Sequence, residues 1–235
     1  MDYAFLTSRD LNLGMNYLRF KMGTAFPVSK RLGYLADTRK LLEREDEIGI
    51  QSSWFFRTIT RPFKELEADL LAKGHEIAFH AERIENESFF MKDLKTVAKN
   101  VKIIGFTKHG SRGLPSPPPV RGEMYNPELC IERAKNSGLS YFCGNDVVPT
   151  DASKIVNGIV FFPSVFWVGP GYMDDSKFSV EWLIEYQKDH DVVVLIHPSD
   201  AIKGLPTYIE KVESIYSRCD EFVSFKKYLE IKKIP

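Results

Sequence analysis

Cysteine, net charge and long apolar runs are all scarce in this chain of 235 residues. Its three cysteines, Cys130, Cys143 and Cys219, form no C-x-x-C pair. They therefore indicate neither a disulfide framework nor a thiolate zinc site, and we expect all three to be small buried apolar residues. The 32 Lys and Arg residues balance 32 Asp and Glu residues, which argues against a nucleic-acid partner.

Membrane and targeting signals are also missing. No apolar run approaches the ~20 residues that span a bilayer, and the first ten residues lack the basic and apolar regions of a signal peptide. These absences predict a soluble cytoplasmic protein without a membrane partner. Three common site motifs are absent too: the phosphate-binding G-x-x-x-x-G-K-[ST], the zinc-binding H-E-x-x-H, and the G-x-S-x-G of many hydrolases.

What the chain does contain is an alternation of apolar runs and helical patterns, typical of βα units around a mainly parallel sheet. We expect strands at residues 3–6, 51–56, 75–79, 101–106, 139–143, 159–162 and 192–196, and helices at residues 35–47, 63–72, 89–99, 127–136, 178–189, 207–219 and 222–230. This pattern predicts one barrel-like α/β domain over residues 1–235, closed by an apolar face of Phe222, Phe225 and Leu229. The Pro-rich segment 107–126 is expected to be a surface loop over the site.

Polar residues follow several of these strands. In a parallel α/β barrel the loops at the carboxyl ends of the strands converge on one face, where catalytic groups gather. His80, His109 and His197 each follow a predicted strand, and Asp10 follows the first one, whereas His75 begins its strand and belongs to the opposite face. Imidazoles and carboxylates bind metals and transfer protons. Four of them from four strands indicate a site, and the alternative is a set of loop residues hydrogen-bonded to nearby backbone.

Several segments resemble the polysaccharide deacetylase family, also called NodB-like or family 4 carbohydrate esterases, whose fold is a deformed (β/α)7 barrel. Residues 71–80, Leu-Ala-Lys-Gly-His-Glu-Ile-Ala-Phe-His, are similar to the family stretch that ends in its first metal-binding histidine. Residues 47–56 resemble its second strand, residues 222–225 its last strand and helix start, and Leu195-Ile196-His197 its late L-x-H motif. The likeness runs from about residue 3 to residue 230 and identifies the chain as a divergent member.

The resemblance implies a hydrolase that removes an acyl group from an N-acetylated sugar by breaking the carbon–nitrogen bond of a linear amide. It implies that Asp10 is the catalytic base and that His197 is the general acid. It also implies a divalent metal, zinc, held by polar residues at the predicted site: Asp10, Asn12, His80 and His109. The carbohydrate would be contacted by aromatic loop residues, which otherwise anchor the loops: Tyr125, Trp167 and Tyr172.

Three positions depart from the family pattern. Asn12 supplies a neutral carbonyl where the family has a carboxylate, Ile84 stands where its second histidine is expected, and Thr107 stands where an arginine is expected. These departures favour an alternative function, a catalytically impaired barrel that binds a carbohydrate or a protein partner. A third alternative is a hydrolase that lacks a metal, or holds a different one, and acts on another bond.

A metal site with a different set of ligands is compatible with these departures. It would consist of Asp10, His80 and His109, all of which follow predicted strands. If Asp10 is a ligand, it no longer serves freely as the base. Glu82 lies in the same loop as His80, and we expect it to be either a spare carboxylate or an exposed surface charge.

Overall fold

The computed structural model describes residues 34–109, 126–146, 153–168, 179–203 and 206–234. Several predicted features lie outside these residues: the strand at 3–6, most of the Pro-rich segment, Asp10, Asn12, Tyr125 and Tyr172. None of the helices in the described ranges is long and apolar enough to cross a membrane.

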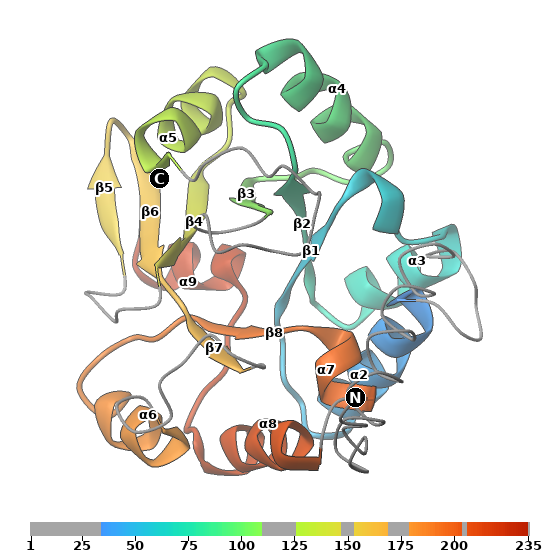
Figure 1. Cartoon of the computed structure of the whole chain (residues 1–235), viewed down its shortest axis with the longest axis vertical. Helices are drawn as coiled ribbons and strands as arrows, with labels where there is room; N and C mark the ends of the chain where they lie inside the picture. Colours follow the sequence, from blue (N-terminus) through green and yellow to red (C-terminus); the bar gives the residue numbers. More distant parts are fainter. Residues whose placement is uncertain (1–33, 110–125, 147–152, 169–178, 204–205, 235) are drawn as a thin grey trace, which may run out of the picture.

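The strands of the described ranges form two sheets (Figure 1). The larger sheet has the order β1-β2-β3-β4-β6-β5 and is parallel except for the β5–β6 hairpin, and the smaller sheet pairs β7 with β8 in parallel. The strands are β1 (Ser53–Phe56), β2 (Glu76–Ala81), β3 (Gly105–Lys108), β4 (Tyr141–Asp146), β5 (Lys154–Val156), β6 (Ile159–Ser164), β7 (Phe166–Val168) and β8 (Val194–Ile196).

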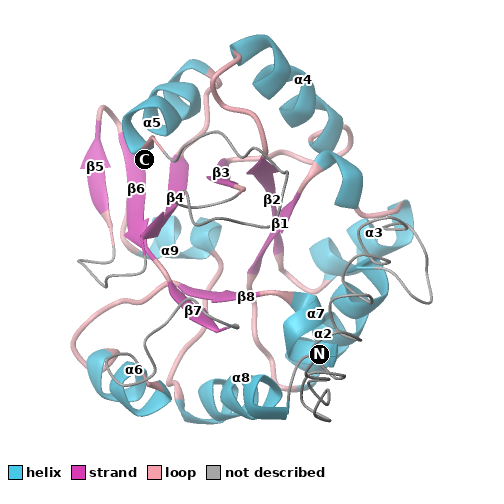
Figure 2. Cartoon of the chain, in the orientation of Figure 1, coloured by secondary structure: helices cyan, strands magenta, loops and turns pink. Residues whose placement is uncertain are grey.

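Helices surround the strands, and most of them lie at the rim of the molecule (Figure 2). They are α2 (Tyr34–Glu47), α3 (Lys64–Ala72), α4 (Glu87–Val97), α5 (Pro127–Asn136), α6 (Val180–Tyr186), α7 (Pro198–Lys203), α8 (Pro206–Arg218) and α9 (Phe225–Ile231), with a 3-10 turn at Thr58–Thr60. The chain is thus a mixed α/β single domain with a mostly parallel sheet.

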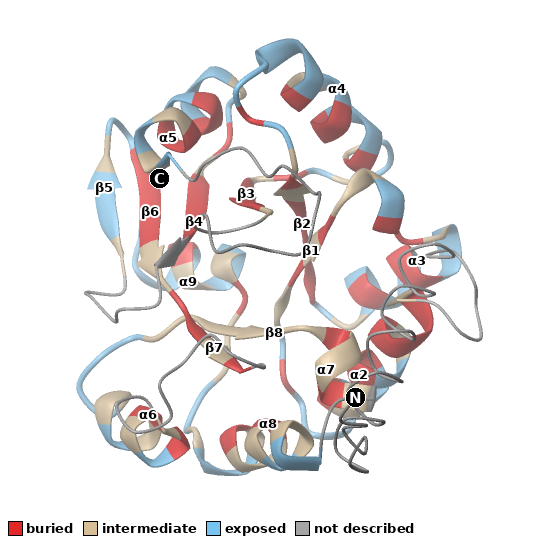
Figure 3. Ribbon diagram, viewed as in Figure 1, coloured by how far each residue is buried: buried red, intermediate tan, exposed pale blue. Residues whose placement is uncertain are grey.

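The outer face of the larger sheet packs aromatic rings against the rim helices. Phe79 lies 5.4 Å from Phe90 of α4, and Phe142 lies 4.9 Å from Phe106 and 5.5 Å from Phe161, between ring centroids. Figure 3 shows the same layer as buried strands facing the buried sides of α4 and α5. Alternation along the strands directs the intervening residues to the other, inner face.

The inner face is covered by α9 and by β8. A second apolar cluster there consists of Tyr141, Cys143, Val160, Phe162, Val165 and Leu229. Phe225 at the start of α9 stacks on Tyr141 with centroids 4.9 Å apart, and Leu195 of β8 packs against the same cluster. Burial of both faces explains why the strands read as continuous apolar runs rather than alternating ones.

Most predicted elements are confirmed, and the differences are local. The helices expected at 35–47, 63–72 and 127–136 begin and end within one residue of α2, α3 and α5. β3 was wrongly placed at 101–106: it lies at Gly105–Lys108, so Thr107 and Lys108 belong to a strand and not to the Pro-rich loop. The short β5, β7 and α7 were missed.

Two further expectations need correction. Cys130 and Cys143 are buried, as predicted, but Cys219 is only half-buried. Phe222 is not on the closing helix, because Ser224 caps α9 by accepting from the Lys227 amide. Phe222 packs on Tyr216 in the main core, with ring centroids 5.7 Å apart.

Candidate functional site

His80 and His109 lie side by side at the carboxyl ends of neighbouring parallel strands. His80 is in β2, where it is paired in register with Thr107 of β3, and His109 follows two residues later on the same face. The His109 amide donates to the Ala81 carbonyl at 2.7 Å and so extends the strand pairing. Nε2 of His80 and Nδ1 of His109 are hydrogen-bonded at 2.9 Å, with the rings edge to face.

Both imidazoles are held in the neutral form. Burial, followed by the nearby Arg57, Lys108 and His197 side chains, lowers the pKa of His109 to about 4. Burial also keeps the pKa of His80 well below its usual value, with smaller contributions from His109, Arg57, His197 and Lys108. Within the described ranges Nδ1 of His80 is buried without a hydrogen-bond partner. Neutral rings keep a lone pair, which a metal or a proton requires.

Two cations and one acid surround the pair. Arg57, directly after β1, forms an ion pair with Glu82, directly after β2, and their side chains are 20% and 27% exposed. Lys108 is fully buried, and its ammonium donates to the His109 carbonyl at 2.9 Å. Glu82 is therefore a half-buried, ion-paired carboxylate. The expectation of an exposed surface charge is therefore wrong, and the role of Glu82 as a spare carboxylate stays a prediction.

His197 directly follows β8, and its carbonyl accepts from the amides of Asp200 and Ala201 in α7. Its Nδ1 lies 3.4 Å from Oδ2 of Asp200, and its ring meets the edge of Trp167 with centroids 5.1 Å apart. The imidazole is 42% exposed. A carboxylate beside Nδ1 keeps the proton there and leaves Nε2 to exchange protons.

Two of the three positions that depart from the family pattern, Ile84 and Thr107, lie in the described residues, and both are buried. Ile84 is fully buried in the main core, and its carbonyl accepts from Nε of Arg133 at 2.9 Å. Arg133 also donates to the Glu85 carbonyl at 3.2 Å and so fixes the loop after β2. Thr107 is buried in β3 beside His80. Position 84 therefore faces the core and not the histidine pair.

The described residues provide two of the donors that a metal would need. Across the part of the chain that the structure describes, no group of three or more His, Cys, Asp or Glu residues is arranged to hold a metal ion. Asp10 and Asn12 lie outside that part. Two nitrogens bound to tetrahedral zinc lie about 3.3 Å apart, given Zn–N distances of about 2.0 Å. The 2.9 Å spacing in the histidine pair fits such a site after a small separation of the rings.

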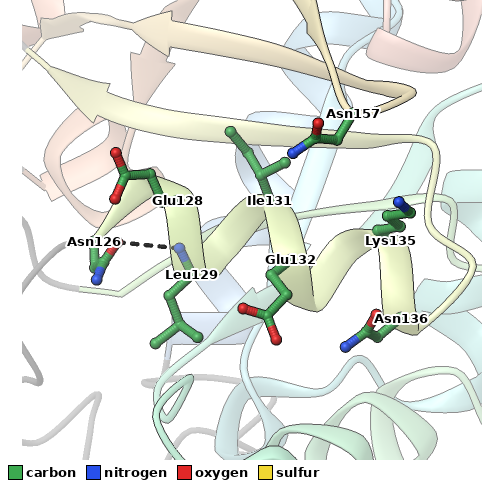
Figure 4. A pocket seen from close by; sticks show the side chains of 8 residues that line it. All are labelled: Asn126, Glu128, Leu129, Ile131, Glu132, Lys135, Asn136 and Asn157. Atoms are coloured by element: carbon green, nitrogen blue, oxygen red, sulfur yellow. Dashed lines mark hydrogen bonds between the residues drawn. The ribbon is translucent and has the colours of Figure 1, made fainter.

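The remaining histidines and a surface depression along α5 lie elsewhere. His75 precedes β2 in a separate buried cluster, and His190 is exposed and stacks on Tyr186. The depression in Figure 4 runs along α5 beside the β5–β6 turn, and it is lined by Asn126, Glu128, Leu129, Ile131, Glu132, Lys135, Asn136 and Asn157. It brings together exposed amides and charges of a helix face and contains no histidine.

Three charged residues of the site were not expected from the sequence: Arg57 and Lys108 near the histidine pair, and Asp200 of α7 beside His197. Arg57 and Lys108 are at or just after the end of a strand, which was the available signal, but a charged residue there usually points to solvent. Comparisons of the chain with models of known families, with characterised proteins and with solved structures find no match.

Proposed function

We propose that the chain is a metal-dependent hydrolase that removes an acyl group from an N-acetylated sugar. The observation that carries the proposal is the contact between His80 and His109, two neutral imidazoles whose nitrogens are 2.9 Å apart at the ends of adjacent parallel strands. Neutral imidazole is the form that binds a divalent metal. The carboxyl end of a parallel sheet is also where α/β enzymes place their chemistry.

The proposal includes closure of the two sheets into a deformed (β/α)7 barrel. Its support is the inner-face cluster, in which Leu195 of β8 and Phe225 of α9 pack on Tyr141 and Phe162 of the larger sheet. In such a barrel the end of β8 faces the ends of β2 and β3. His197 is near enough to the histidine pair for its charge to lower the pKa of both rings.

Each residue has a role in this proposal. His80 and His109 hold a divalent metal, zinc, with Asp10 and Asn12 completing the set from outside the described residues. The metal supplies Lewis acidity to the acyl carbonyl and to a water molecule. Asp10, where it is not a ligand, accepts a proton from that water, and His197 donates one to the departing amine.

The substrate would lie over the ends of the strands. Trp167 is the aromatic residue that the structure describes there, with its ring edge against His197. An indole in this place suits the apolar face of a sugar ring. The half-buried Arg57–Glu82 pair lies beside His80 and offers polar groups to sugar hydroxyls.

A second candidate function is a metal-free barrel that binds a carbohydrate or a protein. It is favoured by Ile84 in the core and by the pairing of Glu82 with Arg57, which leave two imidazoles as the described donors. The cations Arg57 and Lys108 beside the pair also oppose a bound cation. Both candidates use the same face of the sheet and differ in whether it holds a metal.

Calorimetric titration of zinc, cobalt and nickel into chelator-treated protein separates the two candidates. We expect stoichiometric binding to the wild type and its loss in His80→Ala, whereas His190→Ala, at an exposed histidine, retains it. The metal-loaded wild type should release acetate from N-acetylglucosamine oligomers. No specific binding by the wild type, or equal loss in both variants, would refute the metal site and favour the binding barrel.

A further inference from the structure

A second polar cluster lies at the opposite ends of β1 and β2 from the histidine pair. Glu45 of α2 is 4% exposed, and its Oε1 accepts from the Tyr216 hydroxyl of α8 at 2.6 Å. Its Oε2 accepts from Ser52 Oγ at 2.5 Å and lies 3.7 Å from Nδ1 of His75. We call Glu45, Ser52, His75 and Tyr216 the Glu45 cluster. It joins α2 and α8 to the residues that precede the two strands.

His75 contributes no positive charge to this cluster. The Ser52 amide and the Trp54 indole both donate toward Nδ1 of His75, at 3.1 and 3.3 Å. Nδ1 is therefore an acceptor, and the neutral ring carries its proton on Nε2, which is buried without a partner in the described structure. Burial and the charge of Lys73 lower the pKa of His75, so the ring stays neutral at physiological pH.

In the described structure, the charged groups next to the Glu45 cluster pair with one another. On α2 and α8, Arg44 pairs with Glu213 at 2.5 Å and with Glu47 at 3.4 Å, and before β2, Lys73 pairs with Asp46 at 2.9 Å. From α2, α8 and both strand starts, Glu45 thus faces two hydroxyls and a neutral imidazole. Burial raises the pKa of Glu45 to about 7, and the hydrogen bonds from Ser52 and Tyr216 limit the rise.

The cluster can hold or release one proton without moving the backbone. When Glu45 is ionised, the hydroxyls of Ser52 and Tyr216 both donate to it, and their short distances suit charge-assisted bonds. When Glu45 is protonated, its own O–H can donate to Ser52 Oγ, and the Ser52 hydroxyl can turn to His75 Nδ1, 3.1 Å away. Only the direction of the Ser52 hydrogen bond changes.

We propose that the Glu45 cluster is a pH-dependent contact, which holds α8 to α2 more tightly when Glu45 is protonated than when it is ionised. An ionised carboxylate is penalised by burial, and separation of α8 from α2 would return it to water. Loss of the proton therefore favours opening of this joint. The contact between α8 and α2 is connected to the histidine face through α7. Ser199 of α7, two residues after His197, donates to Asp37 of α2 at 3.1 Å. This pH-dependent contact does not depend on the proposed function.

The test compares the wild type with Glu45→Gln and with Glu213→Gln, a control on the exposed ion pair between the same two helices. Urea denaturation at several pH values gives the equilibrium constant of unfolding. Because the folded-state pKa is raised above 4.5, we expect this constant, relative to that of Glu45→Gln, to grow about tenfold per pH unit between pH 4.5 and 7, then level off. Glu213→Gln should keep the wild-type profile.

Hydrogen exchange locates the effect. At pH 8, exchange of α8 amides should be faster in the wild type than in Glu45→Gln, with little difference in α4. The proposal would be overturned if the unfolding constants of the wild type and Glu45→Gln changed in parallel with pH, or if the α8 amides of the two proteins exchanged equally fast. If Glu45→Gln does not fold, NMR of the Glu45 carboxyl group in the wild type decides. Titration of Glu45 near pH 7, with a still higher pKa in Tyr216→Phe, supports the proposal. Titration of Glu45 near the usual 4.5 refutes it.

Discussion

The hydroxyl of Tyr141 in β4 donates a hydrogen bond of 2.9 Å to Oε1 of Glu76 in β2. The side chain crosses the intervening strand over Gly105, where a Cβ would lie 2.2 Å from the Tyr141 ring. Ser53 Oγ and the Lys226 amide donate to the other oxygen of Glu76, at 2.5 and 2.9 Å. These three donors stabilise a buried carboxyl group whose pKa is raised by burial, and they attach α9 to the inner face.

Removing the hydroxyl of Tyr141 should destabilise the fold. In Tyr141→Phe the buried Glu76 loses one of three donors, so we expect the free energy of unfolding to fall by about 1–3 kcal/mol. Tyr228→Phe is the matched control, because its hydroxyl bonds to Ser153 and Asp191 in a more exposed place. Urea denaturation measures both, and an equal loss in the two variants would contradict a special role for the Glu76 contact.

Deleting residues 221–235 should abolish the cooperative unfolding transition. The deletion removes α9, uncovers the inner-face cluster around Tyr141 and Phe162, and takes the Lys226 amide away from Glu76. A chain that ends at Ile231 keeps α9 and should retain the transition. Differential scanning calorimetry of the two chains tests this. If the chain without residues 221–235 melts like the chain that ends at Ile231, α9 is dispensable.

Most of the fold could be predicted from the sequence, because long periodic segments identify their own type. α2, α3 and α5 combine apolar periodicity with clear ends, such as Asn126, whose side chain caps α5. β5, β7 and α7 have three to six residues each, too few for a period to show. The Asn157-Gly158 pair, with φ of 54° and 82°, was a usable hairpin signal between β5 and β6.

The candidate site could be predicted only in part. Histidines at strand ends were sufficient to nominate His80, His109 and His197. The register that brings His80 against His109, and the ion pair that engages Glu82, depend on which strands are neighbours, and a single sequence does not encode that order locally. Lys108 was missed because a lysine at the end of a strand normally extends into solvent, whereas this one is buried against the His109 carbonyl.

Acid should destabilise the metal-free protein through the histidine pair. His109 has a folded-state pKa of about 4 against 6.5 when unfolded, so the unfolded chain binds more protons between these values. Stability is therefore lost as pH falls from 6.5 to 4, by up to about 3 kcal/mol. His109→Gln should lose less over this range than the wild type, and exposed His190→Gln should lose as much as the wild type. Urea denaturation at pH 7 and 4.5 measures the difference.

Glu45 acts in the opposite direction over nearly the same range, because its raised pKa makes protonation favourable in the folded state. The wild-type profile alone is thus a sum of opposing effects, and the comparison of variants separates them. If His109→Gln and the wild type lose the same stability on acidification, the imidazole of His109 is not held neutral by its surroundings.

The last prediction concerns Arg57, whose guanidinium stands beside the histidine pair and engages Glu82. Arg57→Gln removes a cation and frees a carboxylate two residues after His80. Both changes favour a bound cation, so we expect zinc affinity to rise by roughly five- to tenfold, about 1 kcal/mol, which is the size of one charge interaction at close range when water screens it. Arg61→Gln is the control, because Arg61 comes from the same segment and pairs with Glu67 at 3.8 Å instead. Calorimetric titration of zinc compares the two variants, and an affinity that falls in Arg57→Gln, or rises equally in both, would place the metal away from the Arg57–Glu82 pair.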